Sequence, residues 1–75
     1  MTDTNKLKMK IAESGLRKSY LAEACGISPA AFSQRIAGRT RFQVSEIGTL
    51  ARLLRLNKTE MNAIFFSGAV ENIST

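Results

Sequence analysis

Apolar residues recur three and four positions apart along most of the chain, which is the spacing of one face of an α-helix. The clearest run follows the i, i+3, i+4, i+7 pattern and consists of Ile47, Leu50, Ala51 and Leu54. The alternation of apolar β-branched and polar residues that is typical of strands is almost absent. The pattern therefore predicts an all-α protein.

Glycines and capping residues divide this pattern into five short helices, which are predicted to begin near residues 5, 18, 29, 44 and 58. Asp3 or Thr4 is suited to cap the first helix, and Gly15 to end it. Asn57 and Glu60 outline a capping box at the start of the fifth helix. Because the connections are short, we expect a compact five-helix bundle.

The second and third predicted helices form a helix-turn-helix unit. Gly26 supplies the left-handed backbone that ends the second helix, and Ile27 enters the core as the chain turns. Ser28 is a good N-cap, and the fixed φ of Pro29 suits the first helical position. Two helices joined by such a turn can lay the second one in the major groove of DNA.

Length and charge indicate a single basic domain. The 75 residues, of which 44% are apolar, suffice for one core, which we expect within residues 5–66, followed by a tail at 67–75. Eleven Lys and Arg against six Asp and Glu give a net charge of +5. Such a domain usually meets phosphate on nucleic acid or on lipid, and basic residues scattered over several helices disfavour the lipid surface.

The lack of histidine and the single cysteine exclude several kinds of site. With Cys25 alone there is no Cys/His zinc site, no Cys–His nucleophile pair and no intrachain disulfide. We expect no enzyme and no cofactor, metal or small-molecule effector, since the acidic residues show no paired-carboxylate arrangement. No apolar run has the ~18–20 residues of a membrane span, and no signal peptide is evident, so we expect a cytoplasmic, nucleoid-associated protein.

Eight residues of the helix-turn-helix unit carry a family resemblance: Leu21, Ala22, Gly26, Ile27, Ser28, Phe32, Ser33 and Gly38. At this spacing the chain resembles the Cro and CI repressor-like (XRE-type) helix-turn-helix proteins of bacteria and their phages. The resemblance covers about residues 6–66 and implies a lambda-repressor-like domain that binds duplex DNA. Two features depart from the family's pattern. Arg35 replaces an apolar residue, so the recognition helix is expected to be rotated slightly relative to common members. Pro29 with Ala30 replaces polar side chains, so fewer base contacts are expected.

One face of the third predicted helix is left for DNA. If Phe32 and Ile36 point inward, a rotation of 100° per residue turns the opposite face outward. Gln34 can bind both edge atoms of adenine, and Ser33 can donate or accept a hydrogen bond. The alternative for these two residues is ordinary solvent exposure. The base-reading candidates are Pro29, Ala30, Ser33 and Gln34.

Phosphate contacts are expected around this face. The resemblance puts Lys18 beside a phosphate at the start of the second helix, whose backbone amides also attract anions. It also puts the loop after Gly38 beside the DNA backbone, where contacts position the protein without reading sequence. The phosphate candidates are Lys18, Ser19, Arg35, Arg39, Thr40 and Arg41. Solubilising charge is the alternative for each, and it is the preferred interpretation of Lys6, Lys8, Lys10 and Lys58.

Phe66 is expected to lie off the inward arc of the fifth helix, and an exposed aromatic residue indicates a partner surface. We therefore expect a homodimer through Phe66, Val70 and Ile73, with recognition helices about 34 Å apart. The alternative is that Phe66 folds against the first helix or the tail. The expected function is a Cro-like repressor that blocks a promoter by binding its operator. The alternative function is that of an antirepressor or inhibitor that binds a partner protein through Phe66 and Leu53.

Overall fold

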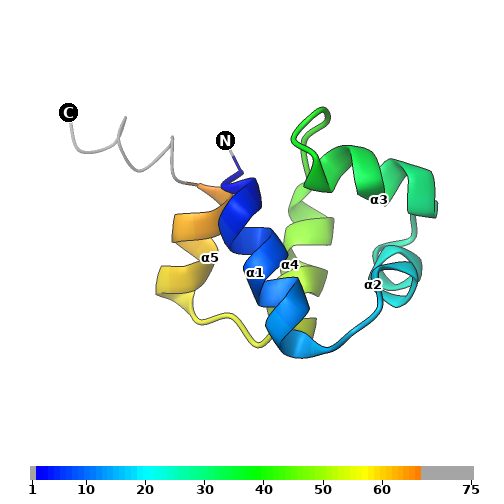
Figure 1. The fold of residues 1–75 in the computed structure, drawn as a ribbon. Helices are drawn as coiled ribbons and strands as arrows, with labels where there is room; N and C mark the ends of the chain where they lie inside the picture. Colours follow the sequence, from blue (N-terminus) through cyan, green and yellow to red (C-terminus); the bar gives the residue numbers. More distant parts are fainter. Residues whose placement is uncertain (1, 67–75) are drawn as a thin grey trace.

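Five helices make up the part of the chain that the computed structural model describes, residues 2–66. They are α1 (Thr4–Ser14), α2 (Lys18–Cys25), α3 (Pro29–Ile36), α4 (Val44–Leu53) and α5 (Lys58–Phe65), and no strand occurs within these residues. Figure 1 shows α2 and α3 at one end of the bundle, α5 at the other, and α1 and α4 between them. The all-α five-helix prediction is confirmed, and every helix begins within one residue of its predicted start.

Local polar contacts explain where the helices begin. The Oδ1 atom of Asp3 and the Oγ atom of Ser28 each accept a first-turn backbone N–H at 3.1 Å, at the starts of α1 and α3. Asn57 and Glu60 form a reciprocal capping box at the start of α5, with hydrogen bonds of 2.7 and 3.0 Å. Such caps contribute about 1 kcal/mol each. At the start of α2, Arg17 provides no side-chain cap.

The turn between α2 and α3 depends on backbone conformation. Gly26 ends α2 with φ 74°, and an added Cβ there would meet nothing within 4 Å. Glycine is therefore favoured by the left-handed backbone rather than by lack of room. The N–H of Ile27 donates to the carbonyl oxygen of Ala22 at 3.1 Å, and the Ile27 side chain packs against the core. The chain reaches α3 after only three residues.

The core joins all five helices. Phe42, in the loop before α4, connects α3 to α5 within this core. Its ring makes edge contacts with Phe32 and Phe65 at centroid distances of 6.2 and 5.6 Å. Helix α2 packs on α3 and α4, and α1 packs on α3 and α5. Each helix contributes one fully buried large side chain, and these are Leu7, Leu21, Phe32, Leu50 and Ile64.

The expectation that Phe66 is exposed is wrong. This residue is partly buried and packs against the core, as does Leu53. Phe66 is the C-cap of α5, with φ −127° and ψ 26°, so the helical rotation that predicted its direction no longer applies there. Val70 and Ile73, the other residues of the expected dimer surface, lie outside the described residues.

Candidate nucleic-acid interface

The face of α3 that points away from the core is exposed. Phe32 and Ile36 hold the helix against the bundle, with 1% and 4% of their surface accessible. This inward pair is as predicted, and it fixes the rotation of α3. The four base-reading candidates are all exposed, as contact with a partner requires, and they are Pro29, Ala30, Ser33 and Gln34. Their contact with DNA bases stays a prediction.

Exposed polar and cationic residues border this face, and we call the following five the basic rim: Lys18, Ser19, Arg39, Thr40 and Arg41. The first two begin α2, and the other three belong to the loop between α3 and α4. The loop is tied to the end of α3, because the N–H of Arg39 donates to the carbonyl oxygen of Gln34 at 3.0 Å. Gly38 allows this return with φ 82°. The start of the loop is therefore positioned by the same backbone as the exposed face.

Arg35 does not belong to this rim, contrary to the prediction. Its Nε atom lies 2.7 Å from Oε1 of Glu46 on α4, and the two side chains are only 15% and 4% exposed. The same Oε1 accepts the backbone N–H of Gln43 at 3.0 Å. Arg35 thus forms a largely buried ion pair that ties α3 to α4. Its side chain therefore lies against α4 rather than on the exposed face of α3.

The signal for this pair was present in the sequence but incomplete. Arg35 stands where the resembling family has an apolar residue, which indicates a side chain at the edge of the core. Glu46, which accepts the backbone N–H of Gln43 at the start of α4, is the one charged residue of 2–66 that is buried. Because buried charges are paired in proteins, the burial of Glu46 requires a cationic partner, and Arg35 is that partner.

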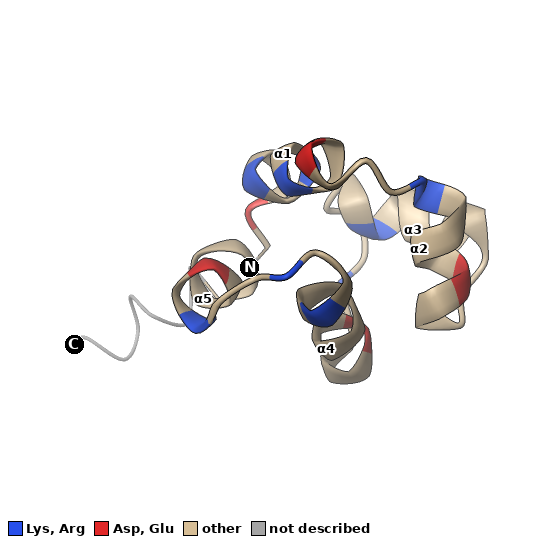
Figure 2. Ribbon diagram, turned by 90° about the horizontal axis from the view of Figure 1, so that it is seen from below, with Lys and Arg blue, Asp and Glu red and all other residues tan. Residues whose placement is uncertain are grey.

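The structure adds one lysine to the neighbourhood of the predicted site. A hollow of about 210 Å³ lies where α1, α2 and α3 meet, and it is lined by Lys8, Lys18, Ser33, Ile36 and Ala37. Figure 2 shows basic positions (blue) on α1 and at the start of α2. Lys8 was interpreted from the sequence as solubilising charge, since nothing in its local pattern shows that α1 lies beside α2 and α3.

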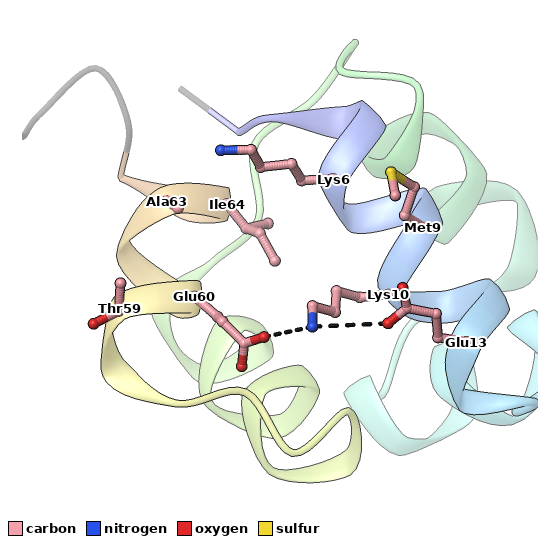
Figure 3. A pocket seen from close by; sticks show the side chains of 8 residues that line it. All are labelled: Lys6, Met9, Lys10, Glu13, Thr59, Glu60, Ala63 and Ile64. Carbon is pink, nitrogen blue, oxygen red and sulfur yellow. Dashed lines mark hydrogen bonds and ion pairs between the residues drawn. The ribbon is translucent and has the colours of Figure 1, made fainter.

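A second hollow, of about 260 Å³, lies between α1 and α5 and contains none of the predicted DNA contacts. Figure 3 shows Lys10 between Glu60 and Glu13, with Lys6 and Met9 at the α1 side. The ammonium group of Lys10 is hydrogen-bonded to Glu60 and lies 3.7 Å from Glu13. This basic residue of α1 is therefore engaged by carboxylates.

The ion pair between Lys10 and Glu60, which joins α1 to α5, is sensitive to very low and very high pH. The hydrogen bond to Glu60 raises the pKa of Lys10 above 10.5, and the hydrogen bonds from Lys10 and from Asn57 lower the pKa of Glu60 below 4.5. The contribution of Glu60 to stability is thus present above its unfolded pKa and is lost as the pH falls through the depressed value. The contribution of Lys10 to stability is lost as the pH rises through its raised pKa.

Comparison with known proteins identifies no relative: no family model, no curated protein and no solved structure matches the chain. Within residues 2–66, no group of three His, Cys, Asp or Glu side chains is placed to hold a metal ion. None of the helices described is both long and apolar enough to cross a membrane. The functional interpretation therefore depends on the geometry of α2, α3 and the loop that follows them.

Proposed function

We propose that this protein binds duplex DNA sequence-specifically, with α3 in the major groove and the basic rim on the phosphates. One observation carries the proposal. A helix held to the core by Phe32 and Ile36 exposes small and hydrogen-bonding side chains on its outer face. Exposed cationic residues lie beside Ser33 at the start of α2 and in the loop that follows α3. This combination suits the major groove, which is wide enough to admit a helix and is bordered by anionic backbones.

The dimensions of α3 agree with such placement. An α-helix with its side chains is about 10–12 Å across, and the major groove is about 12 Å wide, so the eight residues of α3 can lie in it. Near its start, Pro29 and Ala30 have no long side chain to hold the helix away from the base edges. Gln34, one turn further, has the length and the amide geometry to bind both edge atoms of an adenine.

The start of α2 is the second point of contact in this proposal. Its first-turn N–H groups receive no oxygen from the side chain of the cap residue Arg17, and unsatisfied amides at a helix start attract anions. Lys18 and Ser19 stand at the same place and are exposed. A phosphate there would fix the protein along the duplex, while α3 would read the bases.

The regulatory mechanism that we propose is repression by occupancy. A small domain bound to an operator that overlaps a promoter would block polymerase, as in the Cro-like proteins that the sequence resembles. A homodimer would place two copies of α3 about 34 Å apart, one turn of the duplex. The alternative of a protein-gripping module loses support, because Phe66 and Leu53 pack against the core.

Gln34→Ala is expected to relax sequence preference without abolishing binding. A bidentate contact to adenine contributes about 1–3 kcal/mol of discrimination. The affinity ratio between the preferred site and a site changed at that one base pair should therefore fall by about 5- to 150-fold. Selection from random duplexes, followed by titration of the selected site and its single-base variants, measures this loss.

Asn62→Ala is the matched control for this selection, because it removes an exposed amide from α5 at the other end of the bundle. It should select the wild-type site unchanged. Equal discrimination by wild type and Gln34→Ala would refute the role of Gln34. The selected sequences also test the dimer, since two half-sites one helical turn apart are expected for two copies and a single half-site for one.

A further inference from the structure

We propose that the hollow between α1, α2 and α3 is a seat for one phosphate group of the DNA backbone, with Lys8, Lys18 and Ser33 as its ligands. This inference rests on the proposed DNA binding and adds to it a contact from α1. We call the three residues the phosphate seat. They come from three different helices and line one hollow of about 210 Å³, several times the ~30 Å³ of a water molecule in the liquid.

The lining has the chemistry that a phosphate oxygen requires. Two ammonium groups supply up to three N–H donors each, and the hydroxyl of Ser33 supplies one more. Ile36 and Ala37 complete the lining, and none of the five lining residues is acidic. Hydrogen bonds between an ammonium group and a phosphate oxygen are charge-assisted, and such bonds are about twice as strong as those between neutral groups.

Lys8 differs from the neighbouring lysines of α1 in the direction it faces. At 100° per residue, Lys6 and Lys10 lie within about 40° of each other, and Lys8 lies roughly 160° from both. Lys6 and Lys10 line the hollow between α1 and α5 (Figure 3), where Lys10 is paired with carboxylates. Lys8 lines the other hollow and has no ion-pair partner among residues 2–66.

The location of the seat matches the path of a DNA strand in the proposed complex. Lys18 begins α2, where a phosphate is already expected, and Ser33 belongs to the exposed face of α3. A strand that borders the groove occupied by α3 and reaches the start of α2 passes this hollow. The seat thus reassigns Ser33 from base reading to backbone contact, and it extends the DNA surface onto α1.

The test compares Lys8→Ala with Lys6→Ala, which removes the same charge from the opposite side of the same helix. Binding to a random duplex is titrated at several NaCl concentrations. Loss of one phosphate contact should reduce the slope of log affinity against log salt by about 0.9 and weaken binding about tenfold near 50 mM salt. Lys6→Ala should leave the slope unchanged, and Lys8→Arg should restore it. Both alanine variants change exposed residues, and equal melting temperatures verify that they fold.

Two failures are distinguishable in this experiment. If wild type binds the duplex but Lys8→Ala and Lys6→Ala give the same slope, the phosphate seat is refuted while DNA binding stands. If wild type ignores duplex DNA even at the lowest salt, the proposed function fails and the seat fails with it.

Discussion

Raising NaCl from about 50 to 200 mM is expected to weaken binding to a random duplex about 10²-fold per protomer. Lys8, Lys18, Arg39 and Arg41 are four exposed cations placed at or beside α3. If each neutralises one phosphate, counterion release gives a slope of about −3.6 in log affinity against log salt. Fluorescence anisotropy with a labelled duplex measures the slope directly.

The double variant Arg39→Ala/Arg41→Ala tests whether the loop contributes its share of this slope. Its slope should be shallower by about 1.8, because two phosphate contacts are lost, and it should weaken binding to all sequences alike. Arg52→Ala/Lys58→Ala is the matched control, since it also removes two exposed charges, which lie on α4 and α5 outside the proposed interface. If this control changes the slope as much as the loop variant does, net charge rather than the rim attracts DNA.

Glu46→Ala is expected to lower the free energy of unfolding by about 3 kcal/mol. The substitution leaves the guanidinium of Arg35 largely buried without its carboxylate, and breaking such a pair from one side costs about 3–5 kcal/mol. The lower end applies because Arg35 keeps some contact with solvent. The loss is large for 75 residues, whose total stability is of the order of 4–11 kcal/mol. Urea unfolding followed by circular dichroism measures it.

Two companion variants separate the ion pair from its surroundings. Glu46→Gln keeps an oxygen that can accept from the Gln43 backbone and from Arg35, so it should destabilise less than alanine. Arg35→Met/Glu46→Leu removes both charges together and should stay close to wild type, since replacing both partners by apolar residues is often neutral. If Glu46→Ala has the same free energy of unfolding as wild type, the ion pair between α3 and α4 does not contribute to stability.

The helices were predictable because their boundaries are local. Asp3, Ser28 and Asn57 cap α1, α3 and α5 through hydrogen bonds to backbone groups three residues away, and Gly26 ends α2 by its own φ. The inward direction of α3 followed from Phe32 and Ile36, which are one turn apart. Such features need only the nearest neighbours in the sequence.

What the sequence did not predict depends on how the helices pack. Arg35 meets Glu46 eleven positions later only because α3 and α4 meet in the bundle. Lys8 lies beside Lys18 and Ser33 because α1 packs on α3. Phe66 turned inward because the backbone leaves the helical conformation at the cap. For Arg35 and Lys8, the deciding contact is with a residue more than one helical turn away in the sequence.

The most direct test of the central claim is a backbone amide NMR titration of the protein with a short random duplex in dilute buffer. We predict that the largest shift changes cluster at Lys18 and Ser19, along residues 30–37 and in the loop of residues 38–41, with smaller changes near Lys8 and none along α5. Shift changes confined to the hollow between α1 and α5, or a spectrum that the duplex leaves unchanged, would contradict the account.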